Sequence, residues 1–153
     1  MKNLVQLWEN LMDDAHAAYA NAQFEYSLEL NNSALALSKK NFPALFENNA
    51  EQAIATVLVS YFSAIDNCET LSDYPKAQNL FNSALNFLHG EKVKPHLKIQ
   101  QQTAIFRGAS LIYREWCEFI NAHRIDISDT KRSQFQSSIN NLSDLRNSGI
   151  NLH

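Results

Sequence analysis

Apolar residues recur every three or four positions along most of the chain, which is the spacing of one face of an α-helix. The first such pattern includes Leu4, Leu7, Leu11 and Ala15, and similar patterns follow as far as Leu145. No long alternation of apolar and polar residues, the pattern of a half-buried strand, lies between turn residues. The sequence therefore predicts an all-α protein.

Breaks between these patterns divide the chain into six predicted helices. They run approximately over residues 4–19, 24–41, 48–71, 72–90, 97–120 and 128–145. Pro43 follows the second helix and Gly90 is a predicted C-terminal cap of the fourth, whereas Pro75 suits a first helical turn. Ser128 is a predicted N-cap. Six helices predict three antiparallel hairpins in a single domain that covers residues 1–153.

A short internal repeat relates the second and fourth predicted helices. The sequence Asn-Ser-Ala-Leu at residues 32–35 recurs at residues 82–85, and the same offset of 50 superposes Phe24 on Tyr74. Self-similarity at a fixed spacing is typical of proteins built from stacked helical hairpins. The repeat therefore indicates two related units.

These residues resemble the second helix of a tetratricopeptide (TPR) unit. In that family an aromatic residue opens the second helix, a small residue follows, and an Ala-Leu pair comes later; Ser27 and Ala77 hold the small position here. Ala15 supplies the small residue expected where the two helices of a hairpin cross, and Gly108 is a candidate for that position in the third hairpin. The resemblance implies hairpins stacked in a right-handed superhelical array.

The chain also departs from the family's pattern. Its repeat spacing is 50 residues, whereas the TPR period is about 34. Lys39 and Lys40 stand where the family has a proline, and Ile65 replaces the small crossing residue in the second unit. We therefore expect longer helices than in a standard TPR unit. The alternative is a plain helical bundle in which two amphipathic helices share Asn-Ser-Ala-Leu by chance.

Composition and charge exclude several classes of function. The chain has 13 basic and 16 acidic residues, a formal charge of −3, which does not favour nucleic acid. We expect no signal peptide and no membrane span, because the apolar runs are short. Cys68 and Cys117 lie far apart in apolar patterns, so we expect buried thiols in a reducing compartment. These features predict a cytoplasmic protein without a cofactor.

Few residues suggest chemistry, and no catalytic motif occurs. Glu9, Asp13 and His16 share one helix face and could meet a metal ion, but no second ligand-bearing helix matches them, so a solvated surface is the preferred interpretation. His89 and His96 flank a loop with lysines that could hold an anion, although ordinary loop polarity explains them better. No metal site is predicted.

Two arginines and two tryptophans have similarly ordinary explanations. Arg107 and Arg114 could grip a carboxylate or phosphate, but pairing with Glu residues of the same helix is the simpler expectation. Trp8 and Trp116 fall on apolar stripes and are predicted to pack in the core.

The TPR resemblance also implies a binding surface. In that family partners dock on the concave face, which is lined mainly by the first helix of each hairpin. Alignment on the small crossing residue places six residues of this chain there: Met12, His16, Tyr19, Phe62, Asp66 and Glu69. The family's best-known groove clamps a C-terminal carboxylate with Lys and Asn, which the aligned residues do not supply. Asp66 and Glu69 favour a basic or apolar partner instead.

We therefore expect a non-enzymatic protein-interaction module, an adaptor or small chaperone that binds a protein or peptide. The apolar residues of the fifth helix could also support a homodimer. The alternative function is a helical bundle that binds a small ligand or metal between its helices.

Overall fold

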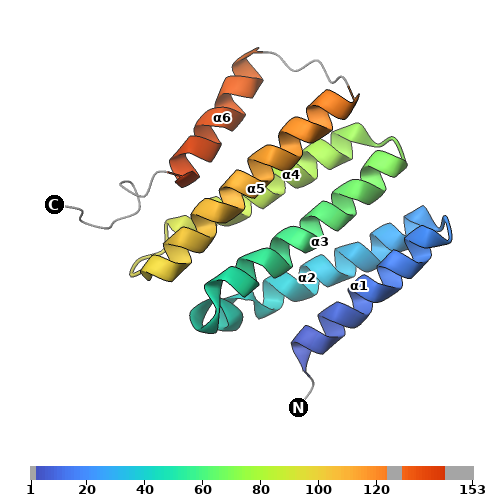
Figure 1. The fold of residues 1–153 in the computed structure, drawn as a ribbon, viewed down its shortest axis with the longest axis horizontal. Coiled ribbons are helices and arrows are strands. Elements are labelled where there is room, and N and C mark those ends of the chain that lie inside the picture. Colours follow the sequence, from blue (N-terminus) through green and yellow to red (C-terminus); the bar gives the residue numbers. More distant parts are fainter. Residues whose placement is uncertain (1–2, 124–128, 144–153) are drawn as a thin grey trace. The chain divides into compact units, whose positions relative to one another are not determined.

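The structure is a computed structural model that describes residues 3–123 and 129–143. Within these ranges it contains helices and turns but no strand, so the all-α prediction is confirmed (Figure 1). The six helices are α1 (Leu4–Ala20), α2 (Phe24–Asn48), α3 (Ala50–Thr70), α4 (Tyr74–Lys92), α5 (Ile99–His123) and α6 (Asp129–Ser143). The superhelical array of the TPR type stays a prediction.

The chain groups into two compact units, Met1–Asn82 and Ser83–His153, with the boundary inside α4. The N-terminal unit contains α1, α2, α3 and the first half of α4. The C-terminal unit contains the rest of α4 together with α5 and α6. One continuous helix, α4, crosses this boundary, and the single domain stays a prediction.

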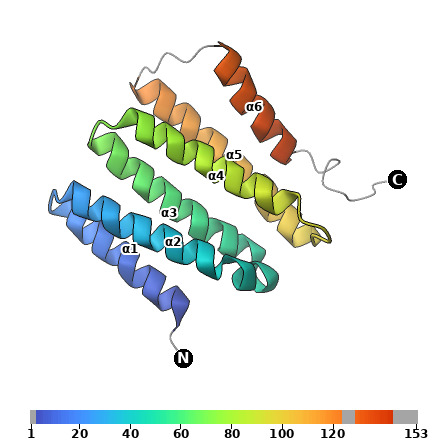
Figure 2. The same cartoon turned by 180° about the vertical axis from the view of Figure 1, so that it is seen from behind.

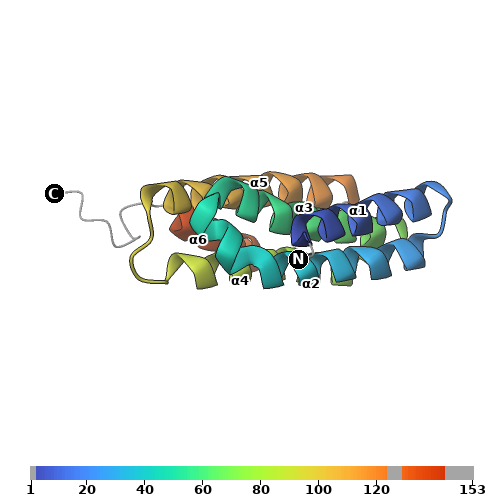
Figure 3. The same ribbon diagram turned by 90° about the horizontal axis from the view of Figure 1, so that it is seen from below.

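In the N-terminal unit, α2 packs against both α1 and α3. α1 and α3 lie in one layer and α2 lies in the other (Figure 3). Seen from behind, α2 lies nearer the viewer than α1 and α3 (Figure 2). Two hydrogen bonds also join α1 directly to α3. The indole Nε1 of Trp8 donates to Ser60 Oγ at 2.8 Å, and the hydroxyls of Tyr19 and Thr70 lie 2.7 Å apart. α1 and α3 are therefore parallel.

Small residues allow α1 and α2 to approach closely. The hydroxyl of Ser27 donates to the backbone carbonyl of Ala15 at 2.7 Å, and both residues are buried. A hydroxyl on so short a side chain can reach the main chain of the next helix only where the two backbones lie close together. The predicted crossing role of Ala15 agrees with this contact.

Two buried asparagines link α2 to α3. Asn31 Nδ2 donates to Asn67 Oδ1, and Asn67 Nδ2 donates to the carbonyl of Phe24 at 3.4 Å. Burying a side-chain amide costs free energy unless the amide is hydrogen-bonded. These hydrogen bonds form only when α3 lies at this position along α2. The pair therefore fixes how α3 lies along α2.

The repeat seen in the sequence reappears in the burial of α2 and α4. From residue 24 to residue 38, each position is as buried or as exposed as the position 50 residues later. The buried pairs are Ser27 and Ala77, Asn31 and Phe81, Ala34 and Ala84, Leu35 and Leu85, and Ser38 and Leu88. The two helices thus use the same face although only some of their residues are identical.

The turn between α1 and α2 ends α1 with a Schellman motif. The N–H of Gln23 donates to the carbonyl of Ala18 at 2.9 Å, and the N–H of Ala22 donates to the carbonyl of Tyr19 at 3.0 Å. Ala22 adopts the left-handed conformation with φ 60°. This position usually carries glycine, because a Cβ is strained there.

The turn between α3 and α4 repeats this geometry. The N–H of Asp73 donates to the carbonyl of Cys68 at 2.8 Å, and that of Ser72 donates to Glu69 at 3.0 Å. Ser72 has φ 58°, close to the value at Ala22. The two hairpins therefore share the same turn as well as the same helix face.

The predicted end of α2 near Asn41 is wrong, because the helix continues through Pro43 to Asn48. A proline inside a helix costs about 3 kcal/mol. The rings of Phe42 and Phe46 stack 4.6 Å apart and are 2% and 5% exposed. Burying two phenylalanines contributes about 1.5–3 kcal/mol each, which outweighs the cost of the proline.

The prediction that Gly90 caps α4 is also wrong. α4 ends at Lys92, whose Nζ donates to the carbonyl of Asn141 in α6, so a tertiary contact holds the extra residues. The predicted start is confirmed: α4 begins at Tyr74, with Pro75 in its first turn. Asp73 caps it by accepting from the backbone N–H of Lys76 at 3.3 Å.

In the C-terminal unit, α5 packs against α6. The rings of Trp116 and Phe135 stack 4.1 Å apart, and Trp116 is 3% exposed, which confirms its predicted core role. Gly108 is buried within α5. The predicted N-cap at Ser128 and the predicted helix end at Leu145 lie outside the described residues.

We predict that Ala22→Gly and Ser72→Gly each raise the free energy of unfolding by about 0.5–1 kcal/mol, because glycine removes the strained Cβ at φ near 60°. Urea denaturation would measure the change. Ala17→Gly, an exposed position within α1, is the matched control and should lower stability by about 1 kcal/mol. Equal destabilisation by all three substitutions would contradict the left-handed turns.

We predict that Gly90→Ala stabilises the protein by about 1 kcal/mol, since alanine is the better helix former in a helix interior. An added Cβ at this position meets nothing within 4 Å. Thermal unfolding followed by circular dichroism would detect the increase. A loss of stability would instead show that Gly90 ends the helix.

Candidate partner-binding surface

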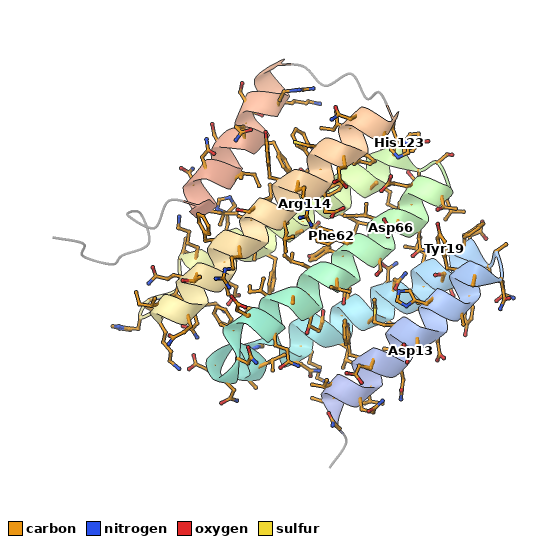
Figure 4. The ribbon with its side chains drawn as sticks, viewed as in Figure 1. Asp13, Tyr19, Phe62, Asp66, Arg114 and His123 are labelled. Atoms are coloured by element: carbon orange, nitrogen blue, oxygen red, sulfur yellow. The ribbon has the colours of Figure 1, made fainter. Side chains whose placement is uncertain are left out.

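The candidate surface is the side of α1 and α3 that points away from α2, which we call the α1–α3 face. Figure 4 shows Asp13 and Tyr19 on α1 and Phe62 and Asp66 on α3. Asp13, Tyr19 and Asp66 are exposed, whereas Phe62 is partly exposed. The parallel arrangement of α1 and α3 therefore brings these residues onto one surface of the N-terminal unit.

The six residues that the TPR resemblance placed on a binding surface differ in exposure. His16 and Asp66 are exposed, Tyr19 is 39% exposed, and Phe62 and Glu69 are partly exposed. Met12 is only 4% exposed and belongs to the core between the helices. Five of the six can thus meet a partner at the surface of this unit, while Met12 supports them from below.

Tyr19 and Val59 give the α1–α3 face its apolar character. Val59 is 44% exposed although it lies within the most apolar helix of the unit. The ring of Tyr19 packs edge-on against Phe24 with centroids 5.0 Å apart, while its hydroxyl bonds Thr70. Tyr19 is therefore held in place yet accessible, which is a favourable state for a contact residue.

The α1–α3 face is also acidic. α1 and α3 contain six Asp and Glu residues and no Lys or Arg. Glu9 and Asp13 are exposed and stand four residues apart on α1, where like charges cost the helix about 0.2–0.5 kcal/mol. Neither lies in the first turn, where a carboxylate would stabilise the helix dipole. Helix stability therefore does not explain these two carboxylates.

The metal hypothesis for Glu9, Asp13 and His16 gains no support. Across the part of the chain that the structure describes, no group of three or more His, Cys, Asp and Glu side chains could hold a metal ion. The preferred interpretation of these residues as exposed helix surface agrees with their burial.

The basic loop after α4 has partners for its lysines. Lys94 Nζ lies 2.8 Å from one carboxylate oxygen of Glu91 and 2.9 Å from the other, and Lys92 bonds the carbonyl of Asn141. Burial, together with the neighbouring Lys92, lowers the pKa of His89 and so favours its neutral form. The loop therefore offers an anion little unpaired positive charge, in line with the preferred interpretation.

Arg114 pairs within its own helix as expected, whereas Trp8, which was predicted to pack in the core, is only partly buried. The guanidinium of Arg114 lies 3.6 Å from the carboxylate of Glu115 in the same helix. Trp8 is partly buried, and its indole N–H bonds Ser60. Pairing within the protein thus accounts for both side chains.

Three residues of α3 that no sequence pattern singled out hold these helices together: Ser60, Asn67 and Thr70. Ser60 and Asn67 are polar residues inside the apolar stripe of α3, and each is fully buried. A polar residue in such a stripe needs a buried partner. The sequence shows these polar residues within an apolar stripe, but only the tertiary structure shows which residues they hydrogen-bond.

The chain was compared with family models, with curated proteins and with solved structures, and none of them matches it. Among the described helices, none combines the length and apolar character that crossing a membrane requires. The case for a function therefore depends on this chain's own residues.

We predict that the two cysteines differ strongly in reactivity. Burial raises the pKa of the Cys68 thiol, so at pH 8 it forms little of the reactive thiolate and is also inaccessible. Cys117 is partly exposed. An aromatic disulfide reagent should label Cys117 at least about a hundredfold faster, because Cys68 must wait for local unfolding.

Cys117→Ser and Cys68→Ala variants would let each thiol be measured alone. Urea should abolish the difference between them. Equal rates in the native protein would contradict the burial of Cys68.

Proposed function

We propose that this chain is a non-enzymatic interaction module that binds a protein or peptide on its α1–α3 face. The observation that carries the proposal is the pairing of two parallel helices whose register is held by the Trp8–Ser60 and Tyr19–Thr70 hydrogen bonds. This leaves His16, Tyr19 and Val59 exposed on a preformed surface. A surface that is ordered before binding loses less conformational entropy when a partner docks.

The repeated hairpin supports the same proposal. α1–α2 and α3–α4 share their turn geometry and the buried face of their second helix. Stacked helical hairpins expose the first helix of each hairpin side by side, which creates an extended surface suited to proteins and peptides. The TPR resemblance predicts this same use, and the residues that it implies are largely those that are exposed here.

The test is capture of native partners with the full chain and a Tyr19→Glu, Phe62→Glu double variant. We expect the variant to lose at least about 90% of the captured partner, since two charges disrupt an apolar contact, typically by 1–3 kcal/mol or more. Tyr26→Glu is the matched control, because Tyr26 is 54% exposed on α2 and away from the α1–α3 face.

Circular dichroism would verify that all three proteins fold alike. The proposal fails if the double variant retains its partners, or if Tyr26→Glu loses them equally.

A further inference from the structure

The side of the α1–α2 hairpin that points away from α3 carries a cluster of leucines (Figure 1). Leu4, Leu7 and Leu11 follow one another at helical spacing on α1, and Leu30 and Leu37 do so on α2. Leu4 is 42% exposed, and the other four are partly exposed. We call these five residues the hairpin edge.

Contacts within the N-terminal unit place the two stripes on the same side of the hairpin. On α2, Ser27 faces α1, and the positions three and four residues after it lie on either side of it. Asn31 bonds α3, so Leu30 lies on the side away from α3. On α1, Tyr19 and Leu11 stand four residues to either side of the position that Ser27 contacts. Because Tyr19 bonds α3, Leu11 also lies away from α3.

The second hairpin shows how such a stripe is covered. At the offset of 50, the three α1 leucines correspond to Ile54, Val57 and Tyr61 of α3, which are 4%, 0% and 1% exposed. α3 packs against α2, and Lys39 Nζ of α2 lies 4.9 Å from the ring centroid of Tyr61. A neighbouring helix therefore contacts this stripe on α3, whereas the same stripe on α1 remains accessible. Stacked hairpins require their end surfaces to be covered or polar.

The hairpin edge is suited to contact with a second copy of itself. The bond from Ser27 to Ala15 sets the register of the antiparallel helices α1 and α2. In this register, the midpoint of Leu4 and Leu11 lies about 1.5 Å, or one residue, from the midpoint of Leu30 and Leu37 along the hairpin. We propose that this edge joins two copies of the chain across a two-fold axis at that level, with α1 antiparallel to α1 of the partner. The proposal goes beyond the proposed function and uses a different surface.

Opposite charges stand beyond the two ends of the leucine cluster. Asp14 follows Leu11 by three residues, Lys40 follows Leu37 by three residues, and both charged residues are exposed. Because α1 and α2 run in opposite directions, these two residues lie at opposite ends of the cluster. The two-fold arrangement brings Asp14 of each copy toward the end that carries the partner's Lys40. The interface thus has an apolar centre with complementary charges at its rim.

A head-to-tail stack of copies fits the edge less well. Such a stack would place the last helix of one copy against the leucines of the next. Among the α6 residues whose side chains the structure describes, every exposed one is polar, as at Lys131, Gln134 and Asn140. Burying these side chains against leucines would cost free energy. Contact between two identical edges avoids this cost and closes into a dimer.

The test is sedimentation equilibrium of the full chain up to about 100 µM, where we expect a monomer–dimer equilibrium that follows mass action. Leu4→Glu should raise the dissociation constant at least about tenfold, because it places carboxylates against leucines. A glutamate in the first turn of α1 suits the helix dipole, so this variant should keep the native circular dichroism. Val59→Glu and Phe106→Glu are matched controls on α3 and α5, since these residues are 44% and 38% exposed. Both should dimerise like the native chain.

A charge exchange tests the two-fold arrangement itself. Asp14→Lys should weaken the dimer about threefold by placing like charges at the rim, and adding Lys40→Asp should restore the native dissociation constant. The proposal is overturned if the native chain stays monomeric, if it forms oligomers larger than a dimer, or if either control weakens the dimer as much as Leu4→Glu. If the exchanged pair does not restore the dimer, the two-fold arrangement is wrong.

Discussion

The hydrogen bond from the Ser27 hydroxyl to the Ala15 carbonyl marks the constraint on which the N-terminal unit depends, the close approach of α1 and α2. Larger side chains at either position would separate the backbones and remove this bond. Close packing also lets α2 contact α1 and α3 together. The Asn31–Asn67 pair then fixes α3 along α2, since a shift would leave two buried amides without partners.

The properties of the α1–α3 face follow from that packing. Once α2 holds both helices, Trp8 reaches Ser60 near one end and Tyr19 reaches Thr70 near the other. Met12 is turned into the core, while His16 and Val59 remain exposed. The same register that stabilises the unit therefore decides which side chains of α1 and α3 remain exposed.

The fold class and the helix count could be predicted because helical periodicity is a local property. The repeat could be predicted as well, since Asn-Ser-Ala-Leu and its upstream aromatic residue mark equivalent faces of α2 and α4. Their shared turns could not, because Ala22 and Ser72 occupy left-handed positions where glycine is the usual signal. On the candidate site, position-by-position alignment identified exposed residues such as His16 and Asp66 but also included the buried Met12.

By itself, the sequence determined which segments are helical, which face of each is apolar, and that α1 and α3 contain no Lys or Arg. These properties depend on residue type and on spacing along the chain. Only the tertiary structure decided that α2 continues past Pro43 and α4 past Gly90, because buried phenylalanines and the contact of Lys92 with Asn141 outweigh local helix-ending signals. It also decided which polar residues of α3 pair with α1 and α2, because hydrogen bonds between residues some 50 positions apart have no local signature.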